Sequence, residues 1–301
     1  METTDTQPTL TPPEAIRLGE TCAACKEALV GAYCHACGER RPHAHDESLW
    51  HFLREQLHEV TSADGRMWRT LRALFVPGKL TDEYFAGRRG LYLRPVRVFL
   101  VANVVFFLVL TLSGGTSNFL GGAETNMDAR FYGDWAASQI EEAATEVGVE
   151  RDVFTGAFDA RAGSLATSLI VVLVPLLALL LTLVLGLTGA STVRHLVFAT
   201  HYLAFAMAVT VALAAVWVPV VLLALRLGAI PQGYWATYSL DPIIQVTLIA
   251  YLVFAIRRVY RLGWTGTVAA ALAVMVGVTA VLVAYQFILF NVTLWTVKVP
   301  A

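Results

Sequence analysis

Five long apolar stretches constrain this chain more than any other feature of its sequence. Each approaches the roughly 20 residues that a helix needs to cross the about 30 Å hydrocarbon core of a bilayer. The predicted spans cover residues 94–113, 165–187, 196–225, 242–257 and 267–290. The chain is 56% hydrophobic and 15% charged, and soluble domains are typically only about 45–50% apolar. These features predict an all-α polytopic membrane protein with about five transmembrane helices.

Charge is distributed unevenly around the predicted spans. Residues 66–97 carry eight Lys or Arg against two acids, whereas residues 113–164 carry three basic and nine acidic residues. Lys and Arg accumulate in cytoplasmic loops, and no apolar signal segment begins the sequence. Every loop follows this rule if the N-terminus is cytoplasmic and the C-terminus external. The sequence therefore predicts a multi-pass protein with this orientation in a cytoplasmic membrane.

The four cysteines form the most specific motif in the sequence. They are arranged as two C-x-x-C pairs, Cys22 with Cys25 and Cys34 with Cys37. Two residues between cysteines let one tight turn direct both thiolates at one ion, and two such turns complete a tetrahedron. A reducing cytoplasm disfavours disulfides, so structural zinc is the predicted cofactor, with a rubredoxin-like iron centre as the alternative. We expect a small zinc ribbon over residues 21–40, after a disordered tail over residues 1–20.

Residues 41–93 are predicted to form cytoplasmic amphipathic helices. Apolar side chains recur at helical spacing over residues 47–60 and again over residues 66–75, and Thr81 is a candidate cap for a further short helix. Such helices can lie in the headgroup layer with arginines on lipid phosphates. Alternatively, they pack on the ribbon and on each other as a small domain, which needs the same pattern. The predicted interface residues are Arg66, Arg69, Arg72, Arg88, Arg89, Arg94 and Arg97.

Three motifs together resemble a known bacterial family. The first is the pair of C-x-x-C turns, and the second is P-G-x-x-x-x-E-Y-x-x-G-R-R-x-x-Y-x-x-P, from Pro77 to Pro95. The third is R-H-L-V-F-A-T-H-Y-L-A-F from Arg194 to Phe205, in which Arg194 stands where the family pattern has an acidic residue. In these motifs the chain is similar to the domain of unknown function 3667 family. The resemblance implies a zinc ribbon joined to a helical domain in the bacterial inner membrane, and it implies no chemistry.

Polar residues well inside the predicted spans are few. Asn103 in the first span and His201 in the third lie at a similar distance from the inner ends of their helices, since each residue adds about 1.5 Å. Ionisable groups within a membrane are candidates for function. We therefore hypothesise that Asn103, His195 and His201 line a polar pocket that opens to the cytoplasm. The alternative is that these side chains form hydrogen bonds between helices.

Residues 113–164 are predicted to be an external acidic loop of the five-span domain, which covers residues 94–295. Two Gly-Gly pairs come before a helix that is predicted over residues 127–147. The acidic side chains of this helix can receive a cationic or protein ligand. They can equally form the solvated face of a helix that lies over the spans.

Two classes of function agree with these features. The sequence contains no H-E-x-x-H, G-x-S-x-G or phosphate-binding loop, so we expect no enzymatic activity. A membrane-anchored zinc ribbon that docks a cytoplasmic protein partner or anionic lipid is the first class. A small transporter or lipid-handling permease is the alternative, but ion-coupled transport needs buried acids or bases, which are scarce here. Membrane lipids are expected partners, and nucleic acid is not, because the ribbon has no basic face.

Overall fold

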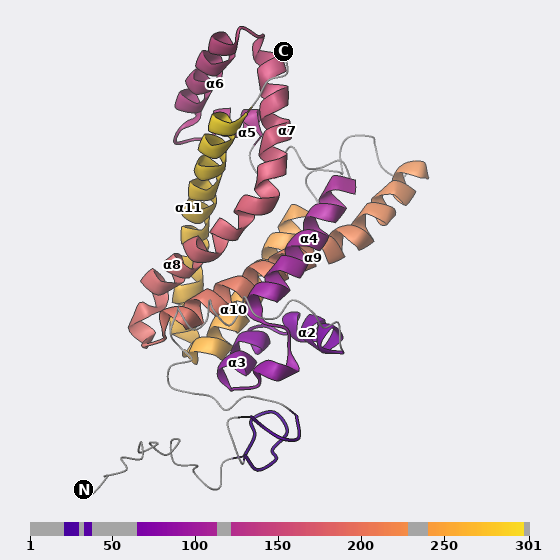
Figure 1. Ribbon diagram of the computed structural model, residues 1–301, viewed down its shortest axis with the longest axis vertical. Coiled ribbons are helices and arrows are strands. Elements are labelled where there is room, and N and C mark those ends of the chain that lie inside the picture. Colours follow the sequence, from indigo (N-terminus) through magenta and orange to yellow (C-terminus); the bar gives the residue numbers. More distant parts are fainter. Residues whose placement is uncertain (1–20, 30–32, 38–64, 113–121, 228–239, 298–301) are drawn as a thin grey trace, which may run out of the picture.

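The computed structural model describes residues 21–29, 33–37, 65–112, 122–227 and 240–297 (Figure 1). These residues are almost entirely helical, and an isolated β-bridge joins Thr21 to Ala28. The predicted tail over residues 1–20 and the predicted helix over residues 47–60 lie outside the described residues. The α-helices are α2 (Arg66–Leu74), α3 (Lys79–Phe85), α4 (Pro95–Leu112), α5 (Ala123–Met127), α6 (Gly133–Val147), α7 (Arg151–Leu169), α8 (Leu173–Leu185), α9 (Thr192–Arg226), α10 (Asp241–Tyr260) and α11 (Trp264–Thr296). Short 3-10 turns are η2 (Arg89–Leu91), η3 (Ile170–Val172) and η4 (Gly186–Thr188).

Five helical segments of the described chain are long and apolar enough to cross a membrane. They run over Arg89–Leu112, Arg151–Thr188, Thr192–Val221, Pro242–Tyr260 and Trp264–Thr296. Each overlaps one of the five predicted spans. The predicted fold class is therefore confirmed as an all-helical protein with five candidate membrane-spanning helices, consistent with a multi-pass membrane protein.

The second span is much longer than the sequence predicts. Helix α7 continues through η3, α8 and η4 as one segment of 38 residues, about 57 Å at 1.5 Å per residue. The hydrocarbon core is only about 30 Å thick, so this segment is longer than one crossing requires. The segment bends between α7 and α8 (Figure 1). The turn η3 ends three residues before Pro175, whose missing N–H and ring disturb the preceding helical turn.

The segment predicted as an external loop is largely helical. Helices α5 and α6 pack against α7 and α11 to form a cap with its own apolar core around Ile140, Phe158 and Phe290. The helix expected over residues 127–147 is interrupted and begins only at Gly133. A Cβ atom on Gly133 would lie 2.3 Å from the carbonyl oxygen of Met127. Only glycine therefore allows the tight turn that separates α5 from α6.

The membrane bundle is organised around α9. Helices α4 and α8 both pack against α9, and α11 packs against α8, α10 and α7. The largest side chains in its fully buried interior include Phe99, Leu181, Ile256 and Tyr285. Helices α2 and α3 pack on α9 and α10 at the end of the bundle from which α4 begins (Figure 1). The part of the chain before the first span is thus joined directly to the third and fourth spans.

Candidate functional site

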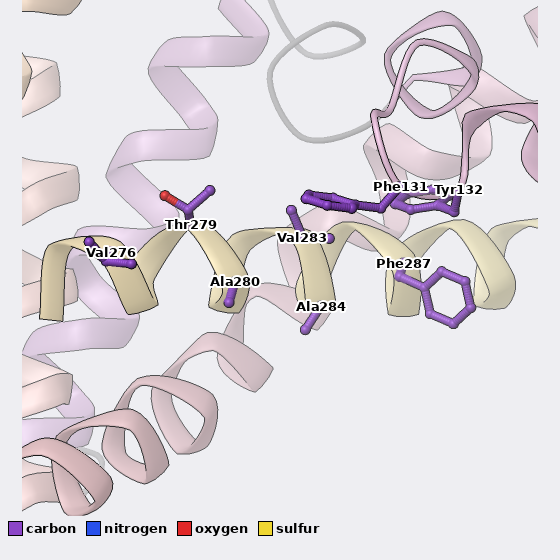
Figure 2. Close-up of a pocket in the computed structure, with 8 residues that line it drawn as sticks. All are labelled: Phe131, Tyr132, Val276, Thr279, Ala280, Val283, Ala284 and Phe287. Carbon is purple, nitrogen blue, oxygen red and sulfur yellow. The ribbon is translucent and has the colours of Figure 1, made fainter. Parts of the chain in front are cut away.

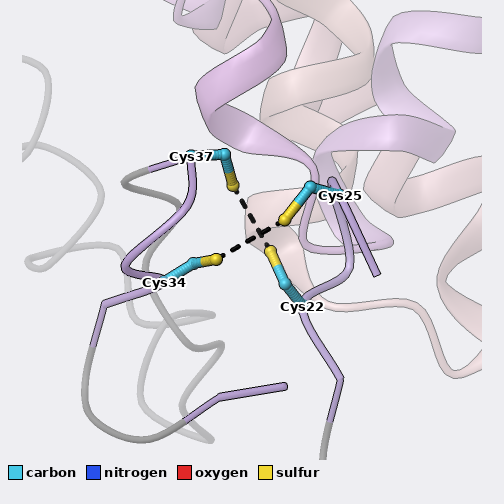
Figure 3. Close-up of side chains that lie close together, drawn as sticks. All are labelled: Cys22, Cys25, Cys34 and Cys37. Carbon is cyan, nitrogen blue, oxygen red and sulfur yellow. Dashed lines mark hydrogen bonds between the residues drawn. The ribbon is translucent and has the colours of Figure 1, made fainter. Parts of the chain in front are cut away.

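The first candidate site is the cysteine cluster, formed by Cys22, Cys25, Cys34 and Cys37. Figure 3 shows the four sulfur atoms directed toward one point between the two turns. All four Sγ atoms lie within 4.8 Å of one another. The distances from Cys22 to Cys37 and from Cys25 to Cys34 are both 3.5 Å. Sulfur atoms around a tetrahedral ion with 2.3 Å bonds are about 3.8 Å apart, so the cluster fits one metal ion.

The local backbone explains how the first turn holds its two thiols. The N–H of Cys22 donates to the carbonyl oxygen of Glu27 at 2.7 Å, and the N–H of Lys26 donates to the carbonyl oxygen of Cys22 at 2.9 Å. Lys26 adopts a φ of 70° to close the turn. Cys22 and Cys34 pack with Leu29 in a small buried cluster, whereas Cys25 and Cys37 are exposed. Half of the ligand set is thereby fixed by burial.

Backbone dipoles in the second turn favour a thiolate. Hydrogen bonds from the backbone of Cys37 and then of Ala36 lower the pKa of the Cys34 thiol from 9.0 to about 6. A metal ion binds the thiolate rather than the thiol. This turn therefore prepares one ligand for metal binding before the ion arrives.

The second candidate site is the contact between the other two motifs, residues 77–95 and residues 194–205. We call residues 66–95 the motif segment; it contains α2, α3 and η2. Between α2 and α3 the chain turns at Gly78, which has a φ of 67°. A Cβ atom here would lie 3.0 Å from both the carbonyl oxygen of Ala255 and Cγ2 of Val259. The glycine therefore lets the turn touch the backbone of α10.

Polar side chains then attach the motif segment to the bundle. The hydroxyl group of Thr81 lies 2.9 Å from Nδ1 of His201 on α9. The hydroxyl group of Tyr251 on α10 donates to the carbonyl oxygen of Leu74 at 3.0 Å. Thr81 is therefore not the predicted cap of α3: the helix begins after Gly78, and Thr81 lies inside it with its hydroxyl group turned to α9.

The remainder of the second motif stabilises the motif segment itself. Arg88 forms an ion pair with Glu83, which raises the pKa of the Arg88 guanidinium. Nε of Arg89 donates to the carbonyl oxygen of Tyr84 at 3.2 Å, and its guanidinium lies 4.4 Å from the centre of the Tyr84 ring. The ring of Tyr84 is buried against Val193 and Val197 of α9. These contacts explain why charged and aromatic residues alternate in this motif.

The arginines predicted to face lipid differ in their surroundings. Arg88, Arg89 and Arg69 all make contacts within the protein, since Nη1 of Arg69 donates to the carbonyl oxygen of Leu91 at 3.2 Å. Arg72 is exposed on α2. Half-buried positions are occupied by Arg66, Arg94 and Arg97.

Arg194 begins the third motif. Its guanidinium lies 4.6 Å from the centre of the Phe85 ring. This cation–π contact gives Arg194 an aromatic partner in α3.

Each of the three polar residues that were expected to share a pocket has its own hydrogen-bond partner. Nδ2 of Asn103 donates to the carbonyl oxygen of Thr167 on α7 at 3.1 Å. Nδ1 of His195 lies 2.9 Å from the hydroxyl group of Tyr260 on α10, and His201 bonds to Thr81. The three side chains thus hold α4, α9 and their neighbours together at different places. These contacts agree with the alternative of hydrogen bonds between helices, and the common pocket stays a prediction.

Sequence reasoning missed the partners of both histidines. Tyr251, Tyr260 and Thr81 each place a hydroxyl group within hydrogen-bond distance of α2 or α9. The available signal was the presence of tyrosines in an apolar span, because a buried Tyr hydroxyl usually needs a hydrogen-bond partner. Pairing each hydroxyl group with its partner required the three-dimensional arrangement.

Comparison with known protein families gives a match over the motif segment. No curated protein matches this sequence, and no solved structure matches it. Residues 64–107 match a family model described as "Protein of unknown function (DUF3667)". The match begins just before α2 and extends into α4. Over the segment that packs on α9 and α10, the chain therefore matches the DUF3667 family that its motifs resemble.

Proposed function

We propose that the protein is a membrane-anchored zinc module that docks a cytoplasmic protein partner. The observation that carries this proposal is the convergence of four thiols within 4.8 Å. Four cysteine ligands complete the tetrahedral shell of zinc and leave no open position for a substrate. A site of this kind stabilises a surface rather than a reaction. The same ligands would hold iron, so the metal must be identified directly.

Metal binding would supply the stability of the cysteine cluster. The buried apolar contacts described there involve only Leu29, the two buried cysteines and Ala24. So small a core cannot offset the entropy of ordering the chain. Zinc contributes on the order of 10–16 kcal/mol to the folding of small zinc modules. The turn that carries exposed Lys26 would then form a defined docking surface.

The motif segment is suited to anchoring this module. Thr81, Gly78 and Leu74 fix its helices to α9 and α10, and Phe75 packs edge-to-face on Phe205 with ring centres 5.8 Å apart. The motif segment, which follows the cysteine cluster in the sequence, is therefore fixed to the bundle. A partner bound to the module would in this way be held at the membrane surface.

One face of α2 is suited to the lipid headgroup layer. Met67, Trp68, Leu71 and Phe75 expose 45%, 67%, 39% and 42% of their surfaces, and Arg72 is exposed beside them. Tryptophan and arginine together are typical of helices that lie at a membrane interface. This face supports the proposal that α2 rests on the cytoplasmic leaflet with cations near lipid phosphates. It would orient the module without being the docking surface itself.

Isolation of the intact protein from membranes in mild detergent tests the proposal. Copurifying proteins, lipids and metal are identified for the wild type, for Cys34→Ser with Cys37→Ser, and for His35→Ala as a control in the same turn. We expect one zinc per chain and a soluble partner in the wild type and the control, both lost in the double variant. A defined small molecule or lipid retained equally by all three, with no protein partner, would favour the lipid-handling alternative and oppose the docking proposal.

A further inference from the structure

A groove runs along the exposed side of α11, next to the cap formed by α5 and α6. It has a volume of about 670 Å³, within the about 300–1,000 Å³ of typical small-molecule sites. Figure 2 shows its residues along α11, with two aromatic side chains over one end. The lining is almost wholly apolar and consists of Phe131, Tyr132, Val276, Thr279, Ala280, Val283, Ala284 and Phe287.

The two aromatic residues at the end of the groove, Phe131 and Tyr132, form what we call the aromatic shelf. Tyr132 is fixed, because its hydroxyl group donates to Oδ1 of Asn126 at 2.7 Å and its ring meets Phe287 edge-to-face at 5.4 Å. Phe131 is 80% exposed. The aromatic shelf thus consists of one ring held in place by its contacts, Tyr132, and one exposed ring, Phe131.

The groove lies at the depth of one membrane leaflet. From Trp264 at the start of α11, Val276 and Phe287 lie about 18 and about 35 Å along the helix axis at 1.5 Å per residue. The hydrocarbon core is about 30 Å thick, so the groove extends from near the bilayer centre to the far boundary of the core. Trp264 lies 3.7 Å from the guanidinium of Arg257 at the basic end of α10. The positive-inside rule places that end in the cytoplasm and the groove in the outer leaflet.

The groove is continuous with the membrane-facing surface of α11. Val276 is 77% exposed, and Leu272 one turn before it is 57% exposed. In a membrane, acyl chains solvate such a surface. Ala280 and Ala284 are small, so this surface is hollowed between Val276 and Phe287, where a chain can lie against the helix.

Charged residues near the aromatic shelf restrict which lipid headgroups can bind there. The turn before the shelf and the start of α6 carry Asp128, Arg130 and Asp134, all exposed. One cation can meet a phosphate group, while two carboxylates repel an anionic headgroup and attract an ammonium group. This arrangement favours a headgroup that carries both a phosphate and an amine.

We propose that the groove binds one acyl chain of a zwitterionic phospholipid from the outer leaflet, with its headgroup at the turn of residues 128–134. Phe131 and Tyr132 would hold the upper part of the chain, and Ala280 and Ala284 would provide the space beneath it. This site is independent of the cysteine cluster and of the docking proposal.

Native mass spectrometry can test this site with the intact protein in nanodiscs of equal phosphatidylethanolamine and phosphatidylglycerol. Ala280→Trp fills the groove, and Leu272→Trp places the same side chain on the same membrane-facing helix outside it. Phe131→Ala is a second variant that removes the shelf without filling the groove. We expect one phosphatidylethanolamine to remain bound to the wild type and to Leu272→Trp. Its occupancy should fall about tenfold in Ala280→Trp, a loss of about 1.4 kcal/mol, and should also fall in Phe131→Ala.

Three outcomes would overturn the proposal. In the first, all four proteins retain the same lipids, which means that the groove holds none of them. In the second, the wild type is a dimer that Ala280→Trp converts to a monomer, which makes a second copy the occupant. In the third, phosphatidylglycerol is retained in preference to phosphatidylethanolamine, which contradicts the headgroup assigned from Asp128, Arg130 and Asp134.

Discussion

The hydroxyl group of Thr81 lies 2.9 Å from Nδ1 of His201, and this buried bond joins residues 120 positions apart in the chain. One partner lies in the second motif, residues 77–95, and the other in the third, residues 194–205. Two stretches that are separated by two candidate membrane spans therefore form a single contact surface. This contact gives polar residues of both motifs a structural role.

Replacing Thr81 with Val should weaken this contact. The change nearly preserves the shape of the side chain but leaves Nδ1 of the buried His201 without its partner, at a cost of about 1–3 kcal/mol. Thr81→Ser keeps the hydroxyl group and should unfold close to the wild type. Thermal unfolding in mild detergent measures the difference. Equal midpoints for the Val and Ser variants would show that the bond does not stabilise the protein.

Gly78→Ala should be more damaging than a comparable change elsewhere. Both Gly78 and Gly148 have positive φ angles, 67° and 75°, so alanine at either position costs roughly 1–2 kcal/mol of backbone strain. A Cβ atom on Gly148 meets nothing within 4 Å, whereas one on Gly78 would press on Ala255 and Val259 at 3.0 Å. Gly148→Ala therefore isolates the strain.

Limited proteolysis of the two glycine variants gives the readout. We expect faster cleavage near α2 and α3 in Gly78→Ala alone, because the turn is pushed away from α10. If Gly148→Ala accelerates cleavage at the same place, the close approach of the turn to α10 is not the cause.

Metal binding by the cysteine cluster should weaken in mild acid. The pKa of Cys34 is lowered to about 6 by backbone hydrogen bonds, so its thiolate is available above that pH and is lost as the pH falls through it. Each ligand that must lose a proton adds about a tenfold decrease in metal affinity per pH unit below its pKa. Competition with a coloured chelator between about pH 5 and about pH 8 follows this decrease. Affinity that stays constant below pH 6 would contradict the assignment of Cys34 as a ligand.

The proposed orientation predicts which residues an impermeant reagent can reach. Glu142 on α6 and Arg72 on α2 are both exposed, and a cysteine at either position can be tested where the native cysteines are serine. On intact cells without an outer barrier, a membrane-impermeant maleimide should label Glu142→Cys directly. Arg72→Cys should be labelled only after permeabilisation. The reverse pattern would invert the orientation assigned from the basic and acidic loops.

The spans were predictable because lipid imposes a simple requirement on the sequence. A helix of some 20 apolar residues spans the bilayer core and pairs its own backbone N–H and C=O groups. The five stretches could therefore be identified from the sequence alone. The C-x-x-C spacing was equally informative, because it fixes local geometry within one turn. Both signals depend on neighbouring residues rather than on the arrangement of the whole chain.

Contacts between distant segments were not predictable in the same way. An amphipathic pattern in residues 66–75 indicates a buried face, but not that Leu74 and Thr81 meet Tyr251 and His201. The arginines were assigned to lipid because a cation near a membrane segment fits phosphate groups. Arg88 and Arg89 also meet Glu83 and Tyr84, partners only five residues away in the sequence. Such local partners can be looked for in the sequence, whereas the contact with lipid stays a prediction.

The attachment of the motif segment also bears on the order of assembly. Leu74 can bond to Tyr251, 177 residues further along the chain, only after Tyr251 has been made, and Thr81 likewise depends on His201. Synthesis begins at the N-terminus, so α2 and α3 are made long before the helices that hold them. Their final positions can be reached only when the fourth span has been inserted. This contact surface would thus form only in a bundle that contains α10. In a chain truncated before α10, the Gly78 turn would lack Ala255 and Val259, against which it packs.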